Sequence, residues 1–271
     1  MNPFDVFLIN PFLNILIAFY KALIFIHFPA ALGFAIILLT VVIRMILWPL
    51  TTTQLRSSQK MASLKPHLDM VKAEHGHDKV KHQQEVSKLY KEHGVNPLAG
   101  CLPLILQIPV FIALYQVLLK VVAFDNADFL LNINQRLLPQ LKLDKIPGPN
   151  FFGFNLADKP SQWSEIGILI LFIPIITGLL QFIQSKMMTP AVKPAVPAVK
   201  KEHKESLEDS MAQVTSQMGL IMPLMIAFFS YGFPVGLSLY WNTFTVIGII
   251  QQYKINGPGG IAKYLPSKWR K

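Results

Sequence analysis

The chain has 271 residues and a mass of 30.6 kDa, and 52% of its residues are hydrophobic while only 15% are charged. The apolar residues gather in runs of about twenty, the length with which an α-helix crosses a hydrocarbon layer of ~30 Å, so the composition excludes a soluble fold and predicts an all-α membrane protein. The single cysteine excludes a disulfide framework, and the meaning of the net charge of +10 depends on where the basic residues stand.

The first apolar stretch, residues 11–28, has three interpretations. A cleaved signal peptide would need basic residues before it, but Asp5 is the only charged residue there. A sixth spanning helix is the second possibility. The third is an interfacial helix with Lys21 and His27 in water, which best fits a stretch of about seventeen residues that ends at a proline. We therefore expect residues 1–30 to form an external segment with an interfacial helix.

Five later stretches predict transmembrane helices. They are residues 31–50, 98–122, 166–183, 218–231 and 235–250. A glycine and a proline, Gly232 and Pro234, disfavour a continuous helix through the last two stretches, so we expect a tight turn between them.

The basic residues predict the orientation of these helices. The segments 51–97, 184–217 and 251–271 contain eight, five and five lysines and arginines, whereas the segments 1–30 and 123–165 together contain five. Cytoplasmic loops are enriched in basic residues. We therefore expect the three basic segments in the cytoplasm, with the N-terminus outside and the C-terminus inside.

The connecting segments differ in character. The segment 51–97 predicts a cytoplasmic helical hairpin interrupted at His75-Gly76-His77-Asp78, although its sparse apolar residues also allow a solvated connector. The outer segment 123–165 is broken by four prolines and predicts a small cap. A run of prolines and alanines at 189–199 predicts an extended linker. The basic tail, 251–271, suits anionic lipid or RNA.

Arg44 is the most informative residue of the chain. It stands fourteen residues into the predicted helix 31–50. An arginine near the centre of a transmembrane helix costs roughly 2.5–3.5 kcal/mol to insert. The side chain would need a tilted helix or entering water to reach an interface ~15 Å away along the helix. A hydrated polar cavity is the interpretation that we favour.

Further polar residues in the predicted helices are candidates for the lining of this cavity. They are Thr40, Gln107, Gln181, Gln184, Trp241 and Asn242. Thr177 extends the stripe of the two glutamines at 181 and 184, and Ser238 and Thr245 extend that of Trp241 and Asn242. Each stripe alone more often marks a contact between helices. Together with an unpaired arginine, they favour a groove that water can enter.

No aspartate or glutamate lies inside a predicted transmembrane helix to pair with Arg44. Proton relays and cation-coupled transporters normally need such acids. An unpaired cation suits a transient anionic guest instead. The guest is either an acidic part of a peptide or, in the alternative, a small anion that passes through a channel or transporter.

Enzymatic chemistry is not predicted, and neither is a cofactor or a metal. The sequence contains no phosphate-binding glycine loop, nucleophile elbow, HExxH motif or paired catalytic carboxylates. Five histidines stand in or beside the predicted hairpin, at 67, 75, 77, 82 and 93. His75 and His77 are not spaced as a helical i, i+4 pair, and no cysteine or carboxylate cluster completes a tetrahedral set.

Three runs of the sequence carry a resemblance to a known family. They are TVVIRMILWPLTTTQLRSSQKMASLKP at 40–66, HGVNPLAGCLPLILQIPVFIALYQVL at 93–118 and GFPVGLSLYWNTFTVIGIIQQY at 232–253. Together they resemble the YidC family of membrane protein insertases, in a bacterial, short form without a large periplasmic domain.

The resemblance implies five transmembrane helices around a hydrophilic groove open to the cytoplasm, with an external interfacial helix and a cytoplasmic helical hairpin. Arg44 stands where the family has its groove arginine, and Gln181, Gln184 and Trp241 are similar to other groove residues. The implied function is that of an insertase and chaperone for nascent membrane proteins in the bacterial cytoplasmic membrane. The implied partners are these clients, the lipid bilayer, the ribosome, the signal-recognition machinery and the Sec translocon.

Overall fold

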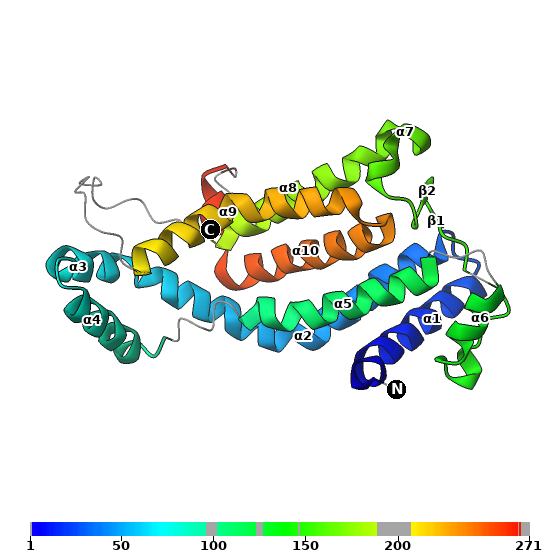
Figure 1. The fold of residues 1–271 in the computed structure, drawn as a ribbon, viewed down its shortest axis with the longest axis horizontal. Coiled ribbons are helices and arrows are strands. Elements are labelled where there is room, and N and C mark those ends of the chain that lie inside the picture. The colour runs from blue at the N-terminus through cyan, green and yellow to red at the C-terminus, as the bar shows by residue number, and fades with distance from the viewer. Residues whose placement is uncertain are drawn as a thin grey trace. The chain divides into compact units, whose positions relative to one another are not determined.

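The computed structural model describes residues 2–95, 102–122, 127–145, 147–188, 207–264 and 266. These residues form mostly helices (Figure 1). They belong to two compact units, each assembled from three parts of the chain. Unit 1 contains Met1–Leu47, Leu104–Leu180 and Met225–Ile247, and unit 2 contains Trp48–Pro103, Gln181–Leu224 and Gly248–Lys271.

Ten α-helices and one short β-hairpin are described. The helices are α1 (Asn10–Phe25), α2 (Ala31–Ser63), α3 (Lys65–His75), α4 (Lys79–Glu92), α5 (Leu102–Val122), α6 (Ala127–Asn134), α7 (Trp163–Ile166), α8 (Phe172–Met188), α9 (Leu207–Gly232) and α10 (Val235–Asn256). The strands β1 (Asn150–Phe151) and β2 (Phe154–Asn155) pair antiparallel. The predicted linker at 189–199 and the end of the predicted basic tail, 267–271, lie outside the described residues.

Three helices in the described part of the chain are long and apolar enough to cross a membrane. They are Asp5–Phe25, Ala31–Met61 and Ile168–Met188, while Gln107–Val121 and Gly219–Gly232 are shorter apolar helices. The first contains the stretch that we expect at the interface, and a π-helical turn lengthens it at its start to 21 residues. By length and composition it could also span, so its interfacial position stays a prediction, as does the number of transmembrane helices.

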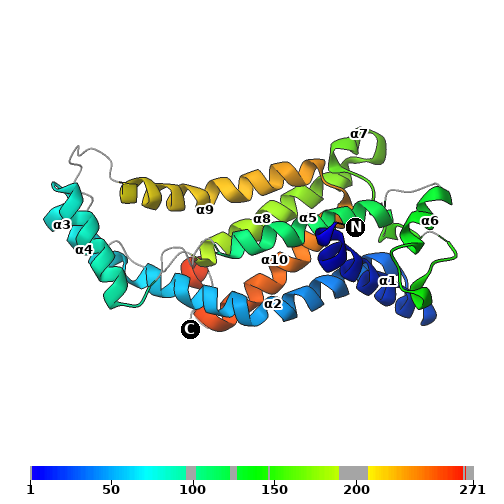
Figure 2. The ribbon, with the colours of Figure 1, turned by 60° about the horizontal axis from the view of Figure 1, so that its bottom comes forward.

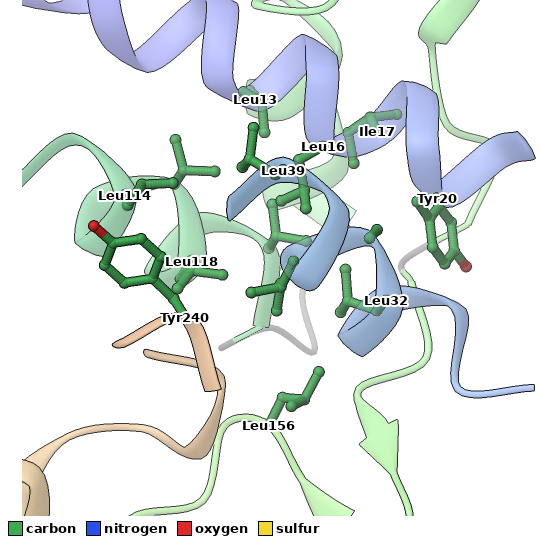
Figure 3. Close-up of a cluster of buried hydrophobic side chains, with 14 of the residues drawn as sticks. Leu13, Leu16, Ile17, Tyr20, Leu32, Leu39, Leu114, Leu118, Leu156 and Tyr240 are labelled. Atoms are coloured by element: carbon green, nitrogen blue, oxygen red, sulfur yellow. The ribbon is translucent and has the colours of Figure 1, made fainter. Parts of the chain in front are cut away.

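The core of unit 1 is formed by one face of α1 packed with α2, α5 and α10 (Figure 3). Leu13, Leu16, Ile17 and Tyr20 of α1 follow the helical spacing and are at most 6% exposed. Leu114 and Leu118 of α5 and Leu156 of the outer segment close the same cluster. Between helices in lipid, such interdigitation stabilises mainly through van der Waals contacts.

The outer segment packs on this core through backbone as well as side-chain contacts. The amides of Val235 and Gly236, at the start of α10, donate to the carbonyls of Asp158 and Leu156 at 2.8 and 2.9 Å. These bonds satisfy two of the amides that a helix leaves free at its N-terminus. The β-hairpin of this segment is not expected from the sequence. Both residues of its turn, Phe152 and Gly153, have positive φ angles. Such an angle is uncommon for a phenylalanine.

α2 begins at Ala31, as predicted, but it continues past the expected end at residue 50 to Ser63. Pro49 lies inside it and removes one backbone donor. The carbonyl of Trp48, the residue before this proline, accepts hydrogen bonds from the hydroxyl of Thr52 at 2.8 Å and from Nε2 of Gln251 at 3.1 Å. The hydrogen bond from Gln251 thus joins α10 to α2 next to this proline.

Gln251 of α10 is fully buried in unit 2 and contacts α2 through both ends of its amide. Its Nε2 donates to Thr51 and Thr52, and its Oε1 accepts from Thr51. Farther along, Asn256 donates to the carbonyl of Leu55 at 3.3 Å. Since higher residue numbers on α2 meet higher numbers on α10, the two helices run parallel in this unit.

α3 and α4 form a helical hairpin in unit 2 (Figure 2). The break between them falls at residues 76–78, where the sequence predicts it. Asp78 caps α4, since its carboxylate accepts hydrogen bonds from the amides of Val80 at 3.0 Å and Lys81 at 3.1 Å. The first arm of the hairpin starts at Lys65, because α2 occupies the segment 51–97 up to Ser63.

The contact between Gly33 of α2 and Phe151 of β1 gives a first testable prediction. A Cβ added at Gly33 would meet the Phe151 ring, so Gly33→Ala should push the β-hairpin off α2 and cost about 1–3 kcal/mol. Thermal unfolding of the purified protein in detergent measures this loss. Gly148→Ala, in the same outer segment, is the control because a Cβ there meets nothing within 4 Å. Equal melting temperatures for the two variants would contradict the prediction.

The cap of α4 gives a second prediction. The amide of Lys81, followed by that of Val80, lowers the pKa of the Asp78 carboxyl. A lowered pKa in the folded protein means that the carboxylate stabilises α4 fully above its ordinary pKa, and that this contribution disappears as the pH falls through the lowered value. The protection factors of α4 amides, which correct for the pH dependence of intrinsic exchange, should therefore fall on acidification.

Two variants separate the charge of Asp78 from its hydrogen bonds. Asp78→Asn keeps a side chain that caps well, so α4 should stay protected with no added acid sensitivity. Asp78→Ala should speed the exchange of the first turn at every pH. If the acid sensitivity persists in Asp78→Asn, the carboxylate is not its source.

Candidate functional site

Arg44 of α2 lies in unit 1 with its side chain turned to α10, and it is 5% exposed. Its Nε and Nη2 donate to the backbone carbonyl of Phe244 at 3.3 and 3.2 Å. Its guanidinium carbon lies 3.8 Å from the centre of the Phe244 ring, which is a cation–π contact. One residue thus supplies both a neutral acceptor and an aromatic face to the cation.

No carboxylate forms an ion pair with Arg44 in the part of the chain that the structure describes. A buried cation without an anionic partner costs free energy that a carbonyl and a ring offset only in part. Among the described residues, the Arg44 guanidinium thus has a single hydrogen-bond acceptor, the carbonyl of Phe244. A guanidinium can bind a carboxylate through a planar pair of N–H donors.

Gln107 of α5 is connected to the same region through Tyr240 of α10. Its Nε2 donates to the Tyr240 hydroxyl at 2.7 Å, and the Tyr240 ring lies 5.9 Å from that of Phe244. Figure 3 shows Tyr240 reaching from α10 toward Leu114 of α5. Tyr240 is 1% exposed, so its hydroxyl depends on Gln107 for a partner.

Trp241 joins this cluster through Phe111, one turn after Gln107 on α5. The two rings meet edge to face with centroids 5.4 Å apart. Three of the residues predicted to line a groove, Arg44, Gln107 and Trp241, therefore belong to one group of polar and aromatic side chains on α2, α5 and α10. We call this group, with Phe111, Tyr240 and Phe244, the Arg44 cluster.

The other predicted lining residues stand apart from these contacts. The hydroxyl of Thr40 is buried and donates to the carbonyl of Ile36 on its own helix at 2.7 Å. Asn242 is half-buried, and its Oδ1 is buried without a hydrogen bond in the described structure. Gln181 and Gln184 lie half-buried in unit 2. The lining of a groove by these residues stays a proposal.

Thr177 and Ser238 extend the predicted polar stripes. In the structure both contact Ser230, and neither contacts Arg44. The hydroxyl of Ser230 on α9 donates to that of Thr177 on α8 at 3.3 Å and lies 3.1 Å from that of Ser238 on α10. All three side chains are 1% exposed. They connect three helices, which is the ordinary role of small hydroxyl residues between membrane helices.

Phe111, Tyr240 and Phe244 are the members of the Arg44 cluster that the sequence analysis misses. Aromatic residues are common in apolar helices, and nothing in their spacing separates a partner of an arginine from a packing residue. Tyr240 stands one residue before Trp241 and could have been singled out, because a hydroxyl in an apolar helix needs a partner. No comparable signal marks the carbonyl of Phe244.

The fold and the cluster define an α-helical membrane protein with a buried cation at a helix interface. Residues 23–259 match the family described as "60Kd inner membrane protein", and the chain belongs to this family.

Two curated relatives are named "Membrane protein insertase YidC". The chain is 35% identical to that of Syntrophobacter fumaroxidans over 224 residues, which are 83% of this chain and 34% of the relative. It is 34% identical to that of Rickettsia rickettsii over 238 residues, which are 88% of this chain and 38% of the relative. The chain thus spans little more than a third of the length of these relatives.

The fold is similar to a solved structure described as "Active YidC insertase crystal structure with the first transmembrane domain resolved". The TM-score is 0.56 at 23% sequence identity, over 93% of this chain and 47% of that chain. This likeness supports the helical fold.

The Gln107–Tyr240 hydrogen bond gives a third prediction. Gln107→Leu removes the partner of a buried hydroxyl and should cost about 1–3 kcal/mol of stability. The double variant Gln107→Leu with Tyr240→Phe leaves no orphaned group, so it should be more stable than Gln107→Leu alone. Thermal unfolding in detergent compares them. A double variant that melts below Gln107→Leu would show that the hydroxyl has another partner.

Proposed function

We propose that the protein is a membrane protein insertase and chaperone for nascent membrane proteins. The observation that carries this proposal is the buried guanidinium of Arg44, which has only a neutral carbonyl and a ring as partners in the described structure. The family and the names of its relatives support the same function. Neither ATP nor a catalytic residue is needed, so the proposed function is not enzymatic.

The proposed mechanism shortens the apolar path that a translocating segment has to cross. Arg44 attracts an acidic tail or short loop of the client, and a hydrated groove lowers the cost of removing this segment from water. In unit 1, the groove is lined by the Arg44 cluster together with Thr40 and Asn242. The apolar helix of the client then leaves sideways into lipid, where its burial favours insertion.

Partners and placement follow from this mechanism. The protein lies in the bacterial cytoplasmic membrane with its N-terminus outside and its C-terminus inside, so that the α3–α4 hairpin faces the cytoplasm. There the hairpin and the basic tail contact the ribosome and the signal-recognition machinery, and the Sec translocon is a further partner. For acidic tails, the membrane potential adds about 2.3 kcal/mol per charge for every 100 mV.

The fourth prediction concerns Arg44 itself. In proteoliposomes, Arg44→Ala should reduce insertion of a client with an acidic tail by about tenfold or more, since hydrogen bonds to a charged group contribute about 1.5–3 kcal/mol. Arg44→Lys should retain part of the activity, because the charge remains while the planar pair of donors is lost. Protease protection of the translocated tail measures insertion.

The control variant is Arg56→Ala, which removes one exposed positive charge from the same helix. It should insert the acidic client as the unchanged protein does. Normal insertion by a folded Arg44→Ala variant would refute the proposed role of Arg44. Anion flux through proteoliposomes that contain neither ribosome nor client would instead favour the alternative, a small-anion channel or transporter.

A further inference from the structure

We infer that Phe244 is a built-in competitor of the client at Arg44, and that it determines how strongly the protein selects acidic clients. The inference rests on the proposed function and adds a regulating residue to its site. Without a client, the Phe244 carbonyl and ring keep the guanidinium in place. A client carboxylate has to displace both, so Phe244 sets the threshold for binding.

The first argument is the edge of the guanidinium that Phe244 occupies. Nε and Nη2 lie on one side of the planar group, and these two donors can bind the two oxygens of a carboxylate side by side. In the structure both donate to the single carbonyl oxygen of Phe244. The position that a bidentate carboxylate would take is therefore already filled by a neutral acceptor.

The second argument is the weakness of this occupant. The two hydrogen bonds are 3.3 and 3.2 Å long, whereas bonds between a guanidinium and a carboxylate are typically about 2.7–2.9 Å and roughly twice as strong as neutral ones. A carboxylate can therefore replace the carbonyl. The exchange leaves no orphaned acceptor behind, because Phe244 lies inside α10 and its carbonyl keeps its place in the helical hydrogen-bond pattern.

The third argument is the ring. The guanidinium carbon is 3.8 Å from the ring centre, and the side chain of Arg44 is only 5% exposed. Because the ring and the carbonyl belong to one residue, a guanidinium that moves off the carbonyl to admit a carboxylate also leaves the ring. Loss of the cation–π contact thus adds to the free-energy cost of binding a client. A client without acidic groups forms no ion pair with Arg44 that would offset this cost.

Two substitutions at Phe244 test this inference, each with a pair of clients that differ only by glutamate or glutamine in the tail. Phe244→Leu removes the π face and should raise crosslinking of the glutamate client to position 241, at subsaturating client, by roughly threefold to tenfold. Phe244→Trp offers a better π face and should lower this crosslinking. Phe228→Leu, at an exposed phenylalanine of α9 outside the Arg44 cluster, is the control and should crosslink the glutamate client as the unchanged protein does. Crosslinking of the glutamine client should respond to none of these substitutions.

The outcome separates this inference from the proposed function. If Arg44→Ala abolishes crosslinking of the glutamate client while Phe244→Leu leaves it unchanged or weaker, the function stands and the competitor role of Phe244 is wrong. If Arg44→Ala has no effect, the proposed site itself fails. Thermal unfolding of each variant identifies a loss of fold. Should Phe244→Leu unfold, an increase for Phe244→Trp or equal crosslinking of the two clients would overturn the inference.

Discussion

A guanidinium has five N–H donors, and an apolar helix bundle offers it few acceptors. The contact of Arg44 with Phe244 is one answer to this constraint. A buried arginine usually needs a carboxylate as its partner. Here the backbone carbonyl and the aromatic ring of Phe244, on a neighbouring helix, take the place of this carboxylate. The arrangement keeps the cation inside the protein, and in the proposed function it lets the cation exchange its partner for a client carboxylate.

The remaining members of the Arg44 cluster place α10 against its neighbours. Gln107 bonds to the Tyr240 hydroxyl, and Phe111 meets Trp241 edge to face, so α5 contacts two successive residues of α10. Because Phe244 is one turn farther along α10, these contacts also help to fix the position of its carbonyl. The proposed site for an acidic client is thus built from packing residues as much as from polar ones.

The sequence predicts the parts of the fold that depend on local signals. The start of α2 at Ala31, the turn between α9 and α10 and the break after His75 all follow from glycine, proline and apolar periodicity. The extension of α2 past Pro49 could not be predicted, because it depends on contacts such as those of Gln251 with Trp48 and Thr52. For the candidate site, the cost of burying a charge singles out Arg44, but a carbonyl partner is invisible because every residue has one. Polar stripes are equally ambiguous, and Thr177 and Ser238 connect helices instead of facing Arg44.

The hydrogen bonds that hold the start of α10 to the outer segment run between main-chain groups, from Val235 and Gly236 to Asp158 and Leu156. Such bonds do not depend on which side chains the two acceptor residues have. The loop can therefore accumulate substitutions at Asp158 during evolution without releasing the helix, whereas a proline at 235 or 236 would remove a donor. The side chain at position 158 can thus change while both main-chain hydrogen bonds to α10, the helix that carries Phe244, are kept.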